Sequence, residues 1–204
     1  SCYNCRFTGW QDTIFNGDPM TCNMKKLMLP DFFQASEVTI VHKFYRNYFK
    51  DCYVCGDVDY IFGPNTAFFD HCEIHSIARV SEGKAYITAA STPAGQEFGL
   101  VFSHCRITGE EPDSVYLGRP WRDCAKTAFI CCELGDHICP EGWQNWGKVR
   151  AEVLSDYIEY GNFGPGADCS GRSPLSRCLV NPEVETYFSK ENVLVGEDGW
   201  IPAE

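Results

Sequence analysis

Asp70-His71-Cys72-Glu73-Ile74 is one of five copies of a short pattern in this chain of 204 residues. Each copy has a lead-in residue, a mostly polar residue, a cysteine, another polar residue and then an apolar one. Successive strand residues point to opposite faces, so the cysteine and the apolar residue share one face, which should be the interior. The other copies are Tyr3-Asn4-Cys5-Arg6-Phe7, Lys50-Asp51-Cys52-Tyr53-Val54, Ser103-His104-Cys105-Arg106-Ile107 and Cys131-Cys132-Glu133-Leu134.

The unequal spacing of these cysteines suits loops of different length between the coils of a parallel β-helix. Helical periodicity is poor along the chain. We therefore predict an all-β fold, a single-stranded parallel β-helix in which the cysteines stack as a buried ladder of small side chains. Stacked side chains in register point the same way, which is unfavourable for disulfide geometry, so packing is expected of them rather than redox chemistry.

The composition narrows the function classes. Hydrophobic residues make up 44% of the chain and its formal net charge is -11. Such a chain can bury a core and forms one domain or at most two. Its acidity argues against nucleic acid binding, which needs clustered Lys and Arg, and no apolar run is long enough to span a membrane. The 5 histidines and 13 cysteines lack the paired spacing of a zinc site, so no metal is expected.

Two aspartates follow the first two copies of the pattern. Asp12 lies in Gly9-Trp10-Gln11-Asp12-Thr13, and Asp59 lies in Gly56-Asp57-Val58-Asp59-Tyr60-Ile61-Phe62-Gly63. Equivalent positions on successive coils face one another at strand spacing, so we predict that Asp12 and Asp59 form a pair. One carboxyl of such a pair tends to hold a proton while the other stays charged. Strand alternation places Asp57 on the face of Asp59, where it could crowd the site, and the plain alternative for each aspartate is a turn beside a glycine.

The third candidate segment is Tyr116-Leu117-Gly118-Arg119-Pro120-Trp121-Arg122. An arginine at a strand end can hold a carboxylate through two parallel hydrogen bonds. The alternative is a surface charge at Arg119, with Trp121 as a core anchor rather than a platform for a sugar ring.

Together and in this order, the three segments resemble the signature motifs of the pectin methylesterase family of carbohydrate esterases. The likeness, closest to bacterial members, extends from about Cys2 to Gly166, and two more segments carry it: Tyr86-Ile87-Thr88-Ala89-Ala90-Ser91-Thr92-Pro93, and residues 134–146. It implies a right-handed β-helix whose long loops form a surface cleft. It also implies hydrolysis of the methyl esters of homogalacturonan to methanol and free carboxylates, without a cofactor.

The resemblance assigns roles to individual residues. Asp59 matches the family nucleophile, Asp12 the acid that protonates departing methanol and later activates water, and Arg119 the residue that orients the nucleophile. Gln11 matches a donor to the developing oxyanion. The chemistry agrees, because a methoxide leaving group needs an acid. The sugar cleft is expected to be lined by Phe62, Trp121 and Trp143.

Three departures accompany the likeness. The family has a further oxyanion glutamine upstream of Gln11, so we expect N-terminal coils to be missing from this chain. Residues 16–43 separate the two aspartates by a long insert, expected as a loop beside the cleft, and Tyr60 stands where phenylalanine is usual. We expect residues 1–166 to form the catalytic β-helix and residues 167–204 a C-terminal linker and cap, with a short helix over 181–190.

Other functions are weighed against this one. The main alternative is a catalytically impaired, pectin-binding or structural fragment of a β-helix. A pectate lyase would need calcium held by several carboxylates, and a serine esterase would need a Gly-x-Ser-x-Gly elbow beside Asp136 and His137, which the sequence lacks. The expected partner is methyl-esterified homogalacturonan, bound by a monomer. The resemblance implies an exported protein, whereas the many cysteines without a disulfide pattern suit a reducing compartment such as the cytoplasm. The sequence does not decide between these two locations.

Overall fold

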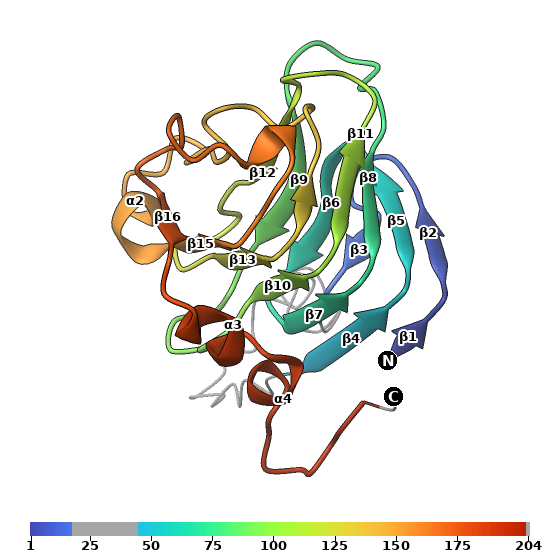
Figure 1. Cartoon of the computed structure of the whole chain (residues 1–204), viewed down its shortest axis with the longest axis vertical. Coiled ribbons are helices and arrows are strands. Elements are labelled where there is room, and N and C mark those ends of the chain that lie inside the picture. Colours follow the sequence, from blue (N-terminus) through green and yellow to red (C-terminus); the bar gives the residue numbers. More distant parts are fainter. Residues whose placement is uncertain (18–44, 203–204) are drawn as a thin grey trace, which may run out of the picture.

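The computed structural model describes residues 1–17 and 45–202. Within these ranges, parallel strands form three sheets that make up the three faces of a right-handed parallel β-helix (Figure 1), which confirms the predicted fold class. The seven-stranded sheet contains, in spatial order, β1 (Cys2–Tyr3), β4 (Arg46–Lys50), β7 (Thr66–Asp70), β10 (Leu100–Ser103), β13 (Lys126–Ile130), β15 (Asp156–Tyr160) and β16 (Ser176–Leu179).

The two remaining sheets follow the same coils. The five-stranded sheet contains β14 (Glu133–Leu134), β11 (Arg106–Gly109), β8 (Glu73–Ser76), β5 (Tyr53–Gly56) and β2 (Arg6–Thr8). The four-stranded sheet contains β12 (Val115–Gly118), β9 (Ala85–Ala90), β6 (Val58–Gly63) and β3 (Ile14–Phe15). Short helices complete the described elements: α2 (Ala151–Leu154), α3 (Glu183–Tyr187), α4 (Lys190–Val193) and the 3-10 helix η1 (Pro165–Ala167).

The repeated cysteine pattern forms a corner of each coil, between the seven-stranded and five-stranded sheets. The residue before each cysteine has a left-handed backbone, with φ between 51° and 53°, and its N–H donates to the strand end of the next coil, as in His71 N to Ser103 O at 3.0 Å. Asn, Asp and His accept this conformation more readily than most residues. We call this row the corner column, and its members are Asn4, Asp51, His71, His104 and Cys131.

Four of the five cysteines of the predicted ladder are buried, and Cys5 on the first coil is partly buried. Cys52, Cys72, Cys105 and Cys132 are each exposed by 2% or less and are free thiols. Their sulfurs hydrogen-bond carbonyls of the neighbouring coil, as in Cys105 Sγ to Phe69 O at 3.3 Å. These contacts let small, soft side chains fill the corner. A disulfide that the spacing did not reveal joins Cys169 to Cys178, outside the ladder.

A second ladder of aromatic rings runs through the interior. Phe49, Phe69, Phe102 and Phe129 stack on successive coils with centroids 4.6, 4.7 and 4.5 Å apart. The register partner of Phe129 on the next coil is not aromatic but Glu159. The apolar stack therefore ends at a buried carboxylate.

Arg172 neutralises this carboxylate. Its Nε and Nη2 donate to the two oxygens of Glu159 at 2.9 and 3.0 Å, and the side chains of Arg172 and Glu159 are only 4% and 2% exposed. Trp143 Nε1 donates to the same carboxylate at 2.9 Å, and Arg172 also donates to the carbonyl of Gly166. A buried ion pair is tolerated only when its remaining hydrogen-bonding atoms are satisfied in this way. We call the group of Trp143, Glu159 and Arg172 the polar plug.

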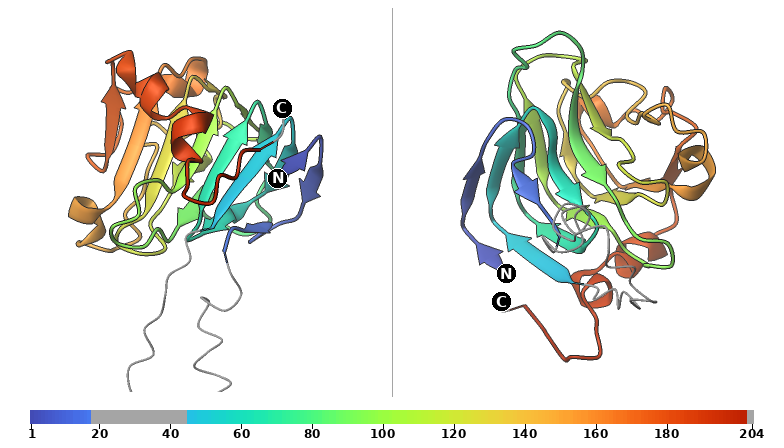
Figure 2. Two further views of the ribbon diagram at one scale, coloured as in Figure 1. Left: turned by 90° about the horizontal axis from the view of Figure 1, so that it is seen from below. Right: turned by 180° about the vertical axis from the view of Figure 1, so that it is seen from behind.

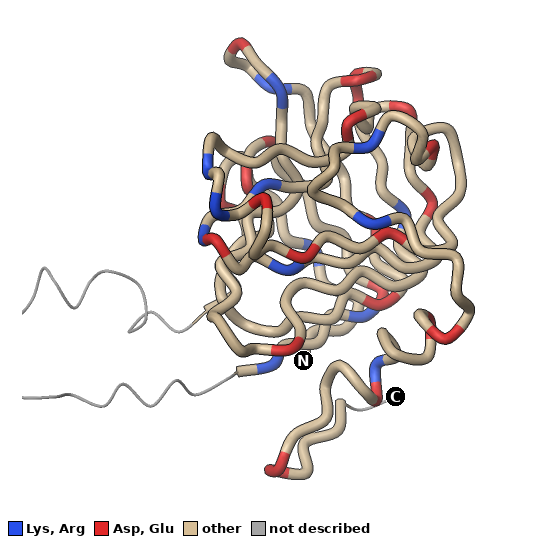
Figure 3. Tube along the Cα trace, turned by 90° about the vertical axis from the view of Figure 1, so that its left-hand side faces the viewer, with Lys and Arg blue, Asp and Glu red and all other residues tan. Residues whose placement is uncertain are grey.

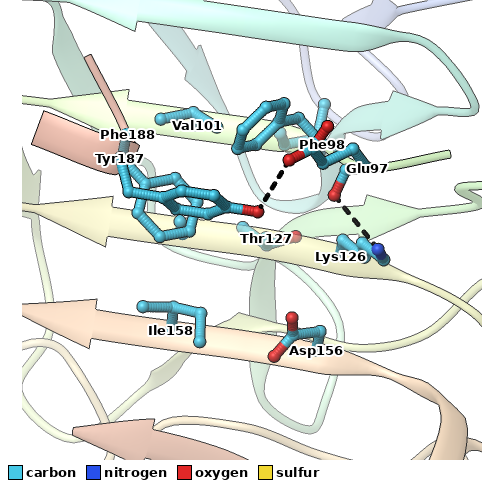
Figure 4. Close-up of a pocket in the computed structure, with 12 residues that line it drawn as sticks. Glu97, Phe98, Val101, Lys126, Thr127, Asp156, Ile158, Tyr187 and Phe188 are labelled. Carbon is cyan, nitrogen blue, oxygen red and sulfur yellow. Dashed lines mark hydrogen bonds between the residues drawn. The ribbon is translucent and has the colours of Figure 1, made fainter. Parts of the chain in front are cut away.

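The C-terminal segment covers the outer face of the seven-stranded sheet (Figure 2). Its strand β16 extends that sheet, and its helices α3 and α4 pack on apolar side chains that point outward. Figure 4 shows Tyr187, the last residue of α3, and Phe188, which follows it, beside Phe98. Tyr187 Oη donates to Glu97 Oε1 at 3.1 Å. The short helix expected over 181–190 is therefore present, whereas the division of the chain at residue 166 stays a prediction.

Charged residues of both signs are interspersed along the described trace (Figure 3). None of the helices in the described ranges is long and apolar enough to cross a membrane. The insert that was expected as a loop beside the cleft, residues 16–43, lies almost wholly outside the described residues.

Candidate active site

Asp12 and Asp59 occupy matching turns on adjacent coils. Both have a left-handed backbone, with φ of 58° and 51°, and Asp12 N donates to Val58 O at 3.2 Å. The structure thus brings the two predicted carboxylates to the same edge of the four-stranded sheet. This coil-to-coil hydrogen bond fixes the backbone of Asp12 against the residue before Asp59, so the pair does not depend on side-chain packing alone.

A bulge decides which aspartate of the second turn faces Asp12. The register of β6 against β9 shifts between Val58 and Ile61, and the left-handed turn at Asp59 breaks the alternation of strand faces. The carboxylate of Asp57 accepts the N–H of Val58 at 2.7 Å. The sequence-based concern that Asp57 shares the face of Asp59 rested on regular alternation, and alternation does not hold here.

Arg119 grips Asp59 through two parallel hydrogen bonds. Its Nε and Nη2 donate to the two carboxylate oxygens at 2.9 and 2.7 Å, and the Asp59 side chain is 7% exposed. Gly118 allows β12 to pack closely on β9 just before Arg119, because a Cβ there would lie 2.1 Å from Thr88 Oγ1. Arg119 N then donates to Thr88 O at 3.0 Å. The two-point contact fixes the plane of the Asp59 carboxylate.

Two aromatic rings hold the guanidinium of Arg119. Its central carbon lies 3.8 Å from the ring centre of Tyr86 and 3.7 Å from that of Trp146. Stacking on aromatic faces is favourable for a guanidinium, more so when water is excluded. These rings restrict the rotation of Arg119 and, through it, the position of Asp59.

The electrostatic surroundings distinguish the two aspartates. The pKa of Asp12 is raised, first by partial desolvation of its carboxyl and then by the negative charge of Asp59, while Arg119 acts in the opposite direction. Asp59 carries the two-point ion pair with Arg119 instead. Asp12 is thus the member of the pair better placed to keep a proton, whereas Arg119 fixes the position of the Asp59 carboxylate.

The remaining predicted site residues divide into two groups. Gln11 is exposed on the turn that carries Asp12. Phe62 and Trp121 are partly buried and meet edge to face at 5.7 Å, which gives the edge of the four-stranded sheet an aromatic surface. Trp143 does not belong with them. It is 2% exposed, stacks on Tyr157 at 4.2 Å and is part of the polar plug, so its placement argues against the predicted contact with a sugar.

His137 is another core residue. It is 1% exposed, and within the described residues neither ring nitrogen has a hydrogen-bond partner. Burial lowers its pKa to about 4, so the ring is neutral at pH 7. His137 therefore contributes packing rather than proton transfer.

Residues 31–197 match the family model described as pectinesterase. The chain belongs to the pectinesterase family. Among curated relatives, it is 37% identical to Pectinesterase 31 of Arabidopsis thaliana over 183 residues, which covers 89% of this chain and 48% of that protein. It is 35% identical over 182 residues to Probable pectinesterase A of Aspergillus fumigatus, covering 85% and 46%.

Solved structures of the family show the same fold. The pectin methylesterase from carrot superposes with a TM-score of 0.75 at 24% identity and covers 98% of this chain and 59% of its own. A pectin methylesterase from Aspergillus niger gives 0.69 at 29% identity, covering 97% and 55%, and that from Yersinia enterocolitica gives 0.65 at 26%, covering 96% and 59%. The chain spans about half the length of the curated relatives it matches. Plant, fungal and bacterial proteins all match, so a closer likeness to bacterial members stays a prediction.

Three residues of this candidate site were not predicted from the sequence. Tyr86 and Trp146 enclose Arg119, and Lys148 lies 4.2 Å from the ring centre of Trp146 while donating to Pro120 O at 2.6 Å. Trp146 could have been predicted as a site residue, because it lies in a segment that carried the family resemblance. The sequence offered Trp143 and Trp146 three residues apart, without a signal to show which one is buried.

Proposed function

We propose that this member of the pectinesterase family hydrolyses the methyl esters of homogalacturonan, releasing methanol and leaving free carboxylates. The observation that carries the proposal is the Asp59 carboxylate held at two points by Arg119, with Asp12 on the matching turn of the next coil. A further match supports the substrate class: a pectin methylesterase in complex with a hexasaccharide, 26% identical, with a TM-score of 0.69.

In the proposed reaction, Asp59 attacks the C6 carbonyl of a methylated galacturonate and forms a tetrahedral oxyanion. The amide of Gln11 donates to this oxyanion. Asp12 protonates the departing methoxide, because methoxide is a poor leaving group without a proton. Asp12, now an anion, takes a proton from water, which hydrolyses the acyl intermediate on Asp59 and regenerates both carboxyls.

Local positive charge compensates for the acidity of the whole chain. The net charge of -11 repels a polyuronide, yet Arg122 and Lys148 lie beside the aromatic surface of Phe62 and Trp121. Lys148 is held in place by carbonyl groups, and partial burial lowers its pKa. We propose that aromatic faces bind the sugar rings while these cations meet the free carboxylates of the polymer.

Methanol release from highly methylated pectin tests the function. The protein is incubated with methylated pectin and with fully de-esterified pectin, and released methanol and polymer binding are measured separately. Catalysis predicts methanol from the first substrate, with one acid equivalent per methanol. Binding to both polymers without methanol would instead support the alternative of a catalytically impaired, pectin-binding or structural fragment.

The raised pKa of Asp12 should depend on its neighbours. We expect Asp59→Asn to lower the pKa of Asp12, because it removes a negative charge, and Arg119→Met to raise it further, because it removes a positive one. Carboxyl NMR titration of labelled aspartates measures both shifts. Asp57→Asn is the matched control and should move the Asp12 titration less than Asp59→Asn does. Equal shifts in the two asparagine variants would contradict the pairing of Asp12 with Asp59.

Trp146 should act on the reaction through Arg119. Trp146→Ala removes one of the two rings that hold the guanidinium, so we expect the rate of methanol release to fall by roughly tenfold, and Trp146→Phe by less. Trp200→Ala is the control, since Trp200 also contacts an arginine, Arg46, at 5.4 Å but lies outside this site. A fall in rate for Trp200→Ala as large as for Trp146→Ala would show that the effect is not local.

A further inference from the structure

The corner column carries chemistry that the esterase site does not use. His71 and His104 lie on successive coils with their rings stacked at 5.2 Å and 7° between planes. Cys131 follows on the next coil, with the same left-handed backbone and the same coil-to-coil hydrogen bond, here to Tyr160 O at 2.8 Å. Unlike Asn, Asp and His, cysteine has no special preference for this backbone. Cys131 on this coil places a thiol next to the imidazole of His104.

A third donor comes from a distant part of the chain. Glu185 lies on α3, and its Oε1 is 3.7 Å from His104 Nε2. Donor atoms of His104, Cys131 and Glu185 all lie within 4.8 Å of one another. The next corner residue is Gly161, and a Cβ there would lie 3.0 Å from Cys131 Sγ, so the glycine keeps that side of the thiol uncovered.

The hydrogen bond of His104 with Ser103 is compatible with the tautomer that a metal-binding histidine needs. His104 Nδ1 lies 3.0 Å from Ser103 Oγ, and with the proton on Nδ1 that hydroxyl accepts it. In that tautomer Nε2, which lies 3.7 Å from Glu185 Oε1, carries a free lone pair, and hydrogen bonding of the second ring nitrogen is the arrangement that fixes the tautomer of a ligating histidine. His104 and Glu185 keep 43% and 51% of their side chains exposed, so an ion has a path to them.

We propose that His104, Cys131 and Glu185 bind a Zn²⁺ ion, with water as the fourth ligand. A thiolate, an imidazole and a carboxylate suit Zn²⁺ and do not suit Mg²⁺ or Ca²⁺, which prefer oxygen. Bonds of about 2.0 to 2.3 Å in a tetrahedron place donors roughly 3.3 to 3.8 Å apart, so small side-chain rotations close the site. The ion would tie α3 to two corners of the β-helix. These corners join the seven-stranded and five-stranded sheets, whereas Asp12 and Asp59 lie on the four-stranded sheet.

Cobalt reports directly on a site of this type. The whole protein is titrated with Co²⁺ under anaerobic conditions, and a thiolate-to-metal charge-transfer band with the intense visible bands of tetrahedral Co²⁺ is expected. Zn²⁺ should abolish these bands stoichiometrically, and a large excess of Mg²⁺ should not. Octahedral Co²⁺ spectra without a charge-transfer band would overturn the proposal.

Matched variants locate the site. Cys131→Ser should remove the charge-transfer band, and Glu185→Gln should weaken Zn²⁺ affinity by roughly tenfold or more while keeping the band. Cys124→Ser, a partly buried free cysteine elsewhere, should change neither. Zn²⁺ should also raise the melting temperature of the parent protein and of Cys124→Ser but not of Cys131→Ser. A band that survives in Cys131→Ser assigns metal binding to other thiols and refutes this site.

Discussion

Replacing Asp59 with asparagine should reduce methanol release by at least roughly 10⁴-fold, since loss of one member of the catalytic group of a hydrolase lowers kcat by about 10⁴ to 10⁶. The amide is isosteric but is a far poorer nucleophile than a carboxylate, and it offers one oxygen instead of two to the Nε and Nη2 of Arg119. The measurement is the initial rate of methanol release from highly methylated pectin, at a substrate concentration that saturates the parent protein.

Asp57→Asn is the control for this variant, because it makes the same change two residues away. Its carboxylate accepts a local backbone N–H and does not contact Arg119 in the structure. We expect it to keep most of the activity. Both variants should melt within a few degrees of the parent, which shows that the fold persists. Substantial activity in Asp59→Asn would exclude Asp59 as the nucleophile, and with it the proposed mechanism.

The largest effect on stability is expected at the polar plug. Arg172→Leu leaves Glu159 buried and unpaired, and removal of one partner of a buried ion pair costs about 3 to 5 kcal/mol of the free energy of unfolding. Urea unfolding followed by circular dichroism measures this as a lower midpoint at an unchanged slope. The fall should be reduced in a second variant that combines Arg172→Leu with Glu159→Gln, because the buried charge is then gone.

Arg177→Leu is the matched control. Arg177 pairs with Asp156 at 2.5 Å at the surface, with side chains 60% and 38% exposed, and such pairs contribute only about 0 to 1 kcal/mol. Equal losses for Arg172→Leu and Arg177→Leu would mean that burial of the Glu159 carboxylate has no energetic consequence, contrary to its place in the core.

The fold could be predicted because its signal is local and repeated. The cysteine and the apolar residue two positions later reappear on every predicted coil, and both are buried on all of these coils except the first, where Cys5 and Phe7 are partly buried. The corner column was not predicted, since the left-handed backbone is a property of the turn and Asn, Asp and His are also common in ordinary loops. The tandem of Phe49, Phe69, Phe102 and Phe129 likewise emerges only when strands are placed in register.

The prediction of the site was right for residues placed by the repeat of the coils. It was wrong for residues whose positions depend on tertiary contacts. Asp12, Asp59 and Arg119 come together as their motifs indicated. The bulge at Asp59 could not be read from a rule of alternating faces, and Trp143 was mistaken for a surface residue because its acceptor, Glu159, lies 16 residues away. No metal was expected, because the three donors of the proposed zinc site come from separate segments without paired spacing.

The corner column also bears on how such a chain can change over time. Its backbone is held by hydrogen bonds between coils. Asparagine, aspartate, histidine and cysteine all occupy these positions with the same backbone conformation. Neighbouring positions of this row are about 4.8 Å apart, close enough for their side chains to contact one another, as His71 and His104 do. Single substitutions at neighbouring positions can therefore assemble or dismantle a binding group while the core and the esterase face stay intact. The corner column is thus a part of the molecule where substitutions can create a new binding site with little effect on the stability of the fold.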